Sequence, residues 1–541
     1  MNDFFTLNIT ISKRFVSNLL SRAEKNLLPV TVGILVAISV ICFIYFLRNG
    51  LGLAYNDARS HLDIGRRVVE SLKPGLAQLG SVWLPLPHLL MVPTIWNDFM
   101  WHSGLSGAIQ SMISFVATSI LIYLFLKRLN VGLLGRMIGV LVFVANVNIL
   151  YLQSTAMTEL LLLATMMAGT YELLRWHESE EILFLIRSAF WIMLASLIRY
   201  EGWFLLLLAG ALVLIHTWRK HGYKVSEGTL ILYGTLAAFG IGLWFLWNAL
   251  IFKDPFYFVF GPFSARAQQA QLETAGVLAT KGNLWLSLKV YSYALIYNSY
   301  ALHAVLAISG ALLLWFDKKL NPSLRLSTLA LIAPFLFNVL ALYLGHSVLF
   351  IQNISGNTWF NVRYGAMMMP AFAIFIGYLV HRLVSLRYVI VSLLLLVTFF
   401  AFTNQDAVTI DDARVGSSQK NVSEVSNYLR DNATNQKGFI LISVASHDAI
   451  VFSSGLPMKR FIHEGTGAYW ESATTSPDRW ARWIVVRSYD DNDLTWKAVS
   501  KVPTFSERYQ KQASYPFADV YELKPEFVSQ LITEPILGKL K

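Results

Sequence analysis

Long apolar stretches and short polar segments alternate over most of the chain. Windows of roughly 17–25 apolar residues, enough for a helix to cross a bilayer, recur between residues 29 and 403. The pattern predicts about eleven transmembrane helices. The expected spans lie near residues 29–47, 102–126, 132–153, 155–174, 183–199, 202–218, 229–252, 290–315, 327–346, 363–380 and 387–403.

The polar segments between the spans predict an orientation. If the spans are counted from the basic N-terminus, five short basic segments fall on the same side as that terminus. Since Lys and Arg in short loops favour the cytoplasm, we expect the N-terminus to be inside. No small-residue cleavage site follows the first apolar run, so a cleaved signal peptide is not expected. The basic segments are residues 127–136, 175–187, 218–224, 317–325 and 381–387.

The same count places the larger polar segments on the outer face. Residues 404–438 are polar and are expected to form a linker followed by a helix. Short β-rich stretches at 439–444, 483–488 and 518–523 then predict a small α/β domain. The expected fold class is a mainly α, polytopic membrane protein with an extracytoplasmic α/β domain at its C-terminus. Residues 1–403, including a first outer loop at 48–101, would form the membrane domain, and 404–541 the outer domain.

Composition agrees with a membrane protein. The chain has 541 residues, 55% of them hydrophobic and 14% charged, and soluble chains carry nearer a quarter charged residues. A net charge of +11 would suggest nucleic acid as a partner for a soluble protein. Here the basic residues of short loops account for the excess, and no nucleic-acid partner is expected. Cys42 is the single cysteine, so no intrachain disulfide can form.

The first outer loop holds the densest mixture of charges. On a helix that begins at Asn56 or Asp57, His61 lies one turn beyond Asp57, and Asp63 one turn beyond Arg59. A carboxylate beside an imidazole is suited to proton abstraction. The plainer interpretation makes Asp57 a helix N-cap and the later charges the solvated face of an interfacial helix.

Ionisable residues also lie at the outer ends of later spans. They are costly at such depths and are therefore functional candidates. Alternatively, Arg199 pairs with Glu201, and Arg363 extends to the interface. The topology places all of them on the side of Asp57, which favours a shared cavity. The candidates are Glu159, Arg199, Tyr200, Glu201, Arg363 and Tyr364, together with His88 of the first loop.

Five short motifs resemble the GT-C class of membrane glycosyltransferases. The likeness is closest to the branch of protein O-mannosyltransferases and lipid A aminoarabinose transferases. It covers roughly residues 29–403, with the polar outer tail as a common appendage, and the order and spacing of the motifs carry most of its weight. The motifs are "YNDARSHLDIGRR" (55–67), "VWLPLPHLL" (82–90), "AMTEL" (156–160), "IRYEGW" (198–203) and "VRYGAMMMPAF" (362–372).

The resemblance implies a polyprenyl-phosphate-linked sugar as donor, and a protein, lipid or glycan as acceptor. The donor's tail would lie among membrane lipid in a groove between spans. Asp57 would be the general base, with His61 and Glu159 as further catalytic residues. Arg199 and Arg363, and after them Arg59, would stabilise the leaving phosphate. The other expected substrate-binding residues are His88, Tyr200, Glu201 and Tyr364.

Asp57, His61, His88 and Glu159 are residue types that bind metals, but their spacing matches no ligand motif. We therefore expect no metal, and no nucleotide-binding motif calls for another cofactor. The leading alternative function is a transporter or lipid flippase that uses the same charged residues. Transporters often carry internal repeats, which this sequence lacks. The expected location is a prokaryotic plasma membrane, crossed many times, with the C-terminal domain outside.

Overall fold

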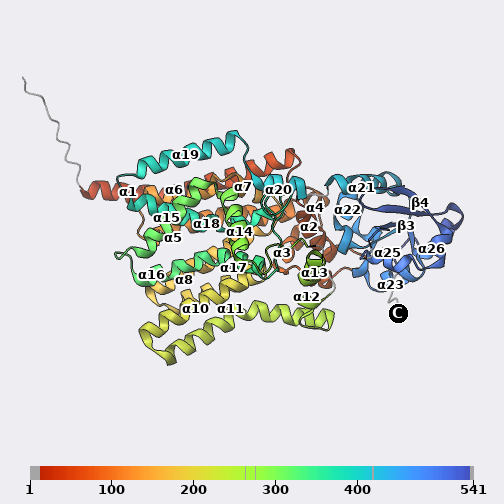
Figure 1. The fold of residues 1–541 in the computed structure, drawn as a ribbon, viewed down its shortest axis with the longest axis horizontal. Coiled ribbons are helices and arrows are strands. Elements are labelled where there is room, and N and C mark those ends of the chain that lie inside the picture. The colour runs from red at the N-terminus through yellow and green to blue at the C-terminus, as the bar shows by residue number, and fades with distance from the viewer. Residues whose placement is uncertain (1–12, 262–263, 275, 417–418, 491, 537–541) are drawn as a thin grey trace, which may run out of the picture.

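The computed structural model describes residues 13–261, 264–274, 276–416, 419–490 and 492–536. A bundle of long helices forms one end of the molecule, and a small sheet flanked by helices forms the other (Figure 1). Short helices lie between these two parts. The bundle contains α1 (Lys13–Arg48), α5 (Leu105–Arg128), α6 (Leu133–Val144), α7 (Val147–Leu152), α8 (Glu159–Ser179), α9 (Ile182–Ser196), α10 (Glu201–His221), α11 (Tyr223–Phe252), α14 (Leu284–Ser299), α15 (Ala301–Phe316), α16 (Pro322–Thr328), the 3₁₀-helix η2 (Leu329–Ile332), α17 (Ala333–Tyr343), η3 (Val362–Met368), α18 (Met369–Arg382) and α19 (Arg387–Thr403).

Among the described residues, seven helices are long and apolar enough to cross a membrane, or up to eight if a bent pair counts as one span. The chain is thus a multi-pass membrane protein. The expected number of about eleven exceeds this because three expected spans fail the same criteria. The segment 132–153 breaks into α6 and α7, where Asn146 caps the second helix by accepting from the N–H of Ile149. Helix α9 has 15 residues, and α8 carries several charges along its 21 residues.

The span expected at 290–315 is interrupted by a sharp bend. Helix α14 ends at Ser299, α15 begins at Ala301, and their axes are bent by 108°. Tyr300 between them has a φ of +68°, which lies in the left-handed region and interrupts the helical hydrogen bonds. Such a break in a span is tolerated where the freed backbone groups are buried in protein and find partners.

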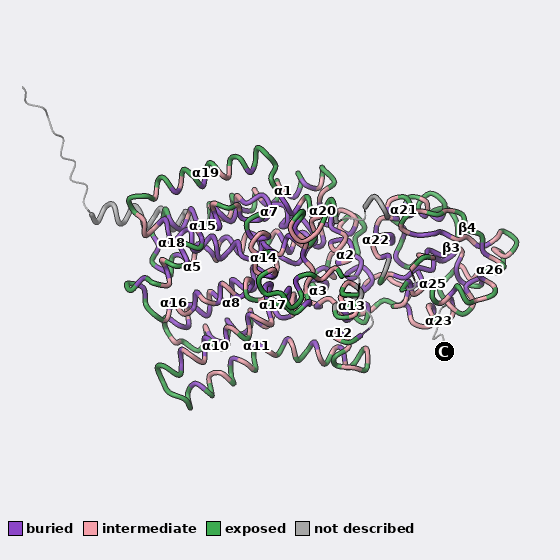
Figure 2. Tube along the Cα trace, viewed as in Figure 1, coloured by how far each residue is buried: buried purple, intermediate pink, exposed green. Residues whose placement is uncertain are grey.

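Helix α18 lies at the centre of the bundle and packs against α6 and α15. In its span, Val362–Arg382, 89% of the apolar window is buried, against 17% for the span that contains α19 (Figure 2). Small residues permit the close packing: a side chain on Gly310 would collide with the backbone of Phe375, and one on Gly135 with that of Gly377. The 3₁₀-helix η3, which begins this span, is therefore fixed by the most tightly packed part of the bundle.

The sheet has five strands in the order β2-β1-β3-β5-β4. Strand β1 pairs parallel with β2 and β3, whereas β5 pairs antiparallel with β3 and β4. Every residue of β1 is buried, as expected for an apolar strand inside a parallel pair. The three predicted β stretches are confirmed. The strands are β1 (Phe439–Ile442), β2 (Phe461–Ile462), β3 (Ala481–Val486), β4 (Tyr509–Ser514) and β5 (Asp519–Leu523).

Short helices lie around the sheet and between the sheet and the bundle. Near the bundle are α2 (Asn56–Val69), η1 (Leu76–Leu79), α3 (Leu86–Ile95), α4 (Asp98–His102), α12 (Tyr257–Phe260), α13 (Ala265–Thr274) and α20 (Val408–Gly416). Around the sheet are α21 (Gln419–Ala433), α22 (Val444–Ser454), η4 (Met458–Arg460), η5 (Glu464–Thr466), α23 (Ala468–Thr475), α24 (Pro477–Trp480), α25 (Leu494–Val499), α26 (Pro503–Arg508) and η6 (Pro525–Gln530).

The segment expected as a linker after residue 403 differs from the prediction. Its first part forms α20, which packs back against α7 and η3 instead of leading directly to the sheet. Val408 and Ala413 of α20 are buried in this contact. In a segment of polar composition, these few buried apolar residues do not stand out.

The orientation of the bundle is open to a direct test. The α10–α11 junction and the sheet lie at opposite ends of the molecule (Figure 1), and the basic junction is predicted to be cytoplasmic. In a Cys42→Ser background, we expect an impermeant thiol reagent to label Ser506→Cys but not Lys224→Cys in intact cells. Both positions are exposed. The reverse labelling pattern would show that the orientation in the membrane is opposite to the predicted one.

Candidate functional site

The side chain of Arg363 lies at the meeting point of three parts of the chain. It is held on η3 and is 5% exposed. Its Nη2 lies 2.6 Å from Asp57 Oδ2, and its Nε lies 3.0 Å from Glu159 Oε1. A guanidinium so far from water requires such partners, because a buried charge is costly unless it is paired. Arg363 therefore does not extend to the interface but is buried in ion pairs.

Arg199 lies on the other side of Glu159. Its Nη1 donates to the same Glu159 Oε1 at 3.1 Å, and its Nη2 lies 3.0 Å from Glu201 Oε1. The pairing of Arg199 with Glu201, which the sequence analysis gave as the alternative, is thus present, and Arg199 also pairs with Glu159. Glu159 is completely buried, and one of its oxygens bridges the two guanidinium groups. Arg199 and Arg363, with the carboxylates of Asp57, Glu159 and Glu201, therefore form one charged cluster.

Two tyrosine rings cover this cluster. The Tyr364 ring centroid lies 5.1 Å from the guanidinium carbon of Arg199 and 5.3 Å from that of Arg363. The Tyr55 ring lies 4.9 Å from Arg363. Aromatic faces attract cations, and the rings also exclude water from one side of the guanidinium groups. The expected grouping of Tyr364 with the arginines is present, whereas Tyr55 was not predicted.

Asp57 differs from the other carboxylates of the cluster in its exposure. Its side chain is 43% exposed, against 0% for Glu159 and 5% for Glu201. Helix α2 begins at Asn56 with Tyr55 as its N-cap residue, so the interpretation of Asp57 as an N-cap is wrong. The exposed carboxylate is accessible to a substrate while one of its oxygens stays paired with Arg363.

His61 lies one turn beyond Asp57 on α2, as predicted, but its side chain contacts other residues. Its Nδ1 lies 2.8 Å from Nε2 of His88, and its ring packs 4.2 Å from the Trp83 ring. Both imidazoles are buried. The expected pair of Asp57 and His61 is replaced by a pair of histidines, because the segment 81–90 folds onto α2. His88 is thereby placed as a partner of His61.

Two other predicted residues also have partners of their own. Arg59 donates from Nε to the carbonyl of Leu53 and from Nη1 to Ser453 Oγ of α22, instead of pairing with Asp63. The Tyr200 hydroxyl donates to the carbonyl of Val82. These contacts connect the first loop to its neighbours in the fold.

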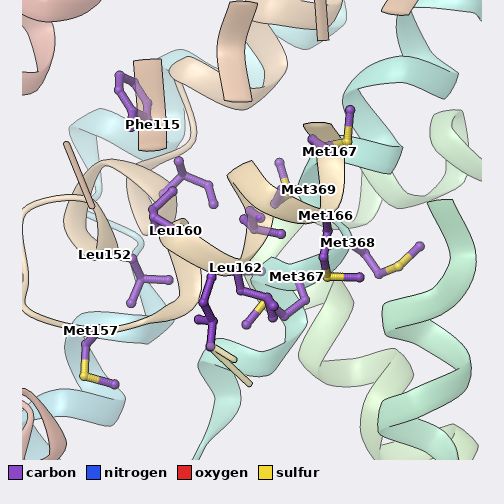
Figure 3. Packing of buried hydrophobic residues seen from close by; sticks show 14 of the residues in the cluster. Phe115, Leu152, Met157, Leu160, Leu162, Met166, Met167, Met367, Met368 and Met369 are labelled. Atoms are coloured by element: carbon purple, nitrogen blue, oxygen red, sulfur yellow. The ribbon is translucent and has the colours of Figure 1, made fainter. Parts of the chain in front are cut away.

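Buried apolar residues follow two members of the charged cluster along the chain. Leu160 and Leu162 follow Glu159 on α8, and Met367 and Met368 follow Arg363 on η3 (Figure 3). A small pocket is lined by methionines of α8, η3 and nearby apolar residues. Flexible methionine side chains fill irregular space and adapt to varied partners.

In the part of the chain that the structure describes, no three His, Cys, Asp or Glu side chains are grouped to hold a metal ion.

The fold is similar to solved membrane-protein structures. ArnT from Cupriavidus metallidurans matches in the apo state with a TM-score of 0.55, and bound to undecaprenyl phosphate with 0.54. Identity is 11% in both, over 90% of this chain and 98% of ArnT. An oligosaccharyltransferase from Archaeoglobus fulgidus, in complex with Zn and sulfate, gives 0.49 at 10% identity over 90% of this chain and 72% of that chain. No protein-family model and no curated protein matches the sequence. The likeness to ArnT confirms the expected GT-C fold.

The histidine pair predicts a pH-dependent stability. Burial, and to a lesser extent Arg199 and Arg363, lowers the pKa of His61 to about 3. An unfolded histidine has a pKa near 6.5, so the unfolded state gains protons first as the pH falls. The stability from this pair is therefore complete above about pH 6.5 and declines toward pH 3. We expect the melting temperature in detergent to fall between pH 7.5 and pH 5.

The control separates the buried pair from other titrating groups. A His61→Gln/His88→Gln variant should lose part of this pH dependence, whereas replacement of the exposed His346 by Gln should leave it unchanged. Equal slopes in the double variant and the wild type would show that the pair does not cause the loss.

Proposed function

We propose that the chain is an integral-membrane glycosyltransferase that moves a sugar from a polyprenyl-phosphate donor to an acceptor on the outer face. One observation carries the proposal: the half-exposed carboxylate of Asp57 lies 2.6 Å from a buried arginine, which shares Glu159 with a second arginine. This places a base beside fixed cations. The fold supports the proposal, since ArnT has been observed with bound undecaprenyl phosphate.

The transfer needs two charge movements. The acceptor hydroxyl or amine forms a bond to the sugar's anomeric carbon and gives its proton to the Asp57 carboxylate. The bond from that carbon to the phosphate oxygen breaks, and its electron pair leaves with the polyprenyl phosphate. Arg363 and Arg199 offset the resulting charge, for which a planar, permanently charged guanidinium is suited.

The ion pairs in the structure suggest how binding of the donor could activate Asp57. Asp57 and a donor phosphate would compete for the same Nη2 edge of Arg363. Arrival of the phosphate releases Asp57 from its ion pair and leaves it free to accept a proton. Glu159 stays with both arginines, because it is buried and bonded to each of them. Its proposed role is thus to position the arginines.

The proposal includes the layout of the whole chain. Residues 1–403 form the membrane domain with the site at its outer end, and residues 404–541 lie outside. The membrane is proposed to be a prokaryotic plasma membrane, and the acceptor a protein, lipid or glycan.

Loss of the protein should leave its donor unused. In a strain that lacks the gene, we expect a polyprenyl-phosphate-linked sugar to accumulate, and lipid mass spectrometry would identify both sugar and carrier. Restoring the wild-type gene should remove the excess. A strain with an unchanged pool of lipid-linked sugars would contradict the proposal and favour a transport function.

The variant Asp57→Asn tests whether Asp57 is the general base of the reaction. Asparagine keeps the size and can still accept a hydrogen bond from Arg363, but it cannot take up a proton. We expect turnover to fall on the order of 10²–10⁴-fold, the usual contribution of a general base. The measurement is clearance of the accumulated lipid-linked sugar by the variant in the deletion strain.

The matched control is Asp98→Asn, at a carboxylate of the same loop whose side chain is 76% exposed. It should clear the lipid normally. Normal clearance by Asp57→Asn at equal protein level would reduce Asp57 to a counter-ion of Arg363.

A further inference from the structure

The segment that follows the last span returns to the charged cluster. In α20, both the N–H and the hydroxyl of Thr409 donate to Asn148 Oδ1 of α7, at 3.0 and 2.8 Å. The carbonyl of Thr409 accepts from the hydroxyl of Tyr55 at 2.8 Å. These three hydrogen bonds of Thr409 hold the start of α20 against the bundle and against Tyr55, the N-cap residue of α2.

One turn further along, Asp412 faces Arg363. Its side chain is 2% exposed, and its Oδ2 lies 3.9 Å from Arg363 Nη1. That distance is too long for a hydrogen bond, so the contact is electrostatic. Asp412 is therefore a third carboxylate beside this arginine, after Asp57 and Glu159.

Tyr55 completes the connection. Its hydroxyl lies 2.8 Å from the Thr409 carbonyl and 3.1 Å from Asp412 Oδ2, and it has one hydrogen to share between them. Its ring covers the guanidinium of Arg363. These contacts form a closed ring. Arg363 pairs with Asp57, and Tyr55 lies two residues before Asp57 in the chain. The Tyr55 hydroxyl contacts Asp412, which in turn faces Arg363.

We propose that Asp412 is a positioning residue of the transfer reaction, and that α20 is thereby part of the active centre. This rests on the proposed function. Asp412 faces Nη1 of Arg363 while Glu159 holds Nε, so that the guanidinium meets the donor phosphate in one fixed orientation. Orientation of this kind is what a charged group needs in order to stabilise a leaving group without reorganising first.

The proposal predicts opposite effects on donor binding and on turnover. Asp412→Asn keeps the size of the side chain and an oxygen for Tyr55, but it removes one negative charge from the cluster. An anionic lipid should then bind at least as tightly as to the wild type. Turnover should fall about 10-fold, because Arg363 is less firmly oriented in the transition state. A merely structural defect would weaken binding and turnover together.

The experiment uses the full-length protein and a control in the same helix. Asp411 is the preceding residue and is exposed, so Asp411→Asn changes the charge of α20 outside the cluster. Affinity is measured with undecaprenyl phosphate as the probe in detergent. Turnover is measured as clearance of the lipid-linked sugar that accumulates in the deletion strain.

A double variant tests the route through Tyr55. Tyr55→Phe keeps the ring over Arg363 and removes the hydroxyl, and we expect a smaller loss of turnover. Combined with Asp412→Ala, which removes the acceptor of that hydroxyl, the losses should not add, since both changes break one connection. Additive losses would show that Tyr55 and Asp412 act separately and would contradict the positioning route.

The remaining outcomes separate this proposal from the general one. If the wild type and Asp411→Asn clear the lipid and Asp412→Asn clears it equally well, the positioning role is overturned and the transferase stands. If Asp412→Asn loses affinity for undecaprenyl phosphate in proportion to its turnover, the residue is structural and the proposal also fails. If no lipid-linked sugar accumulates in the deletion strain, both proposals fail.

Discussion

The pairing of one buried guanidinium constrains the outer half of this molecule. Arg363 has almost no access to water, and an unpaired charge in such a place would cost several kcal/mol. Its three carboxylate neighbours, Asp57, Glu159 and Asp412, come from the first outer loop, the start of α8 and the segment after the last span. The fold can therefore bury Arg363 only if these three distant segments meet.

The backbone around η3 also depends on contacts between segments that are distant in the sequence. The side-chain amide of Asn298 donates to the carbonyl of Val362, next to Arg363. The carbonyl of Asn298 itself accepts from Asn146, the N-cap of the short helix α7, and from Asn148 within that helix. Because α14 stops at Ser299, that carbonyl has no further turn of helix to bond and is available to the asparagines. The break at Tyr300 thus supplies an acceptor that α7 uses, and η3 is held through Asn298.

The sequence was sufficient to predict most apolar spans, three strands and the charged residues at the ends of spans. Glu159, Arg199 and Arg363 were identifiable because a charge in apolar sequence is conspicuous, and the structure brings them together with Asp57. The break at Tyr300 was missed since neither glycine nor proline marks it. Asp412 was missed because it lies in a polar segment, where a carboxylate resembles any solvated one. The partner of His61 depends on how the segment 81–90 packs, which helical spacing does not encode.

The charge balance of the cluster links donor binding to base activation in the proposed reaction. Four carboxylates, those of Asp57, Glu159, Glu201 and Asp412, lie around the guanidinium groups of Arg199 and Arg363. An anionic donor must therefore compete with a carboxylate for these arginines. Three of the four are at most 5% exposed, and moving them would leave charges buried without partners. Asp57, at 43% exposed, can turn toward water at little cost. In the proposed reaction, the phosphate would thus free the most exposed of these carboxylates, and proton removal would wait until the donor is in place.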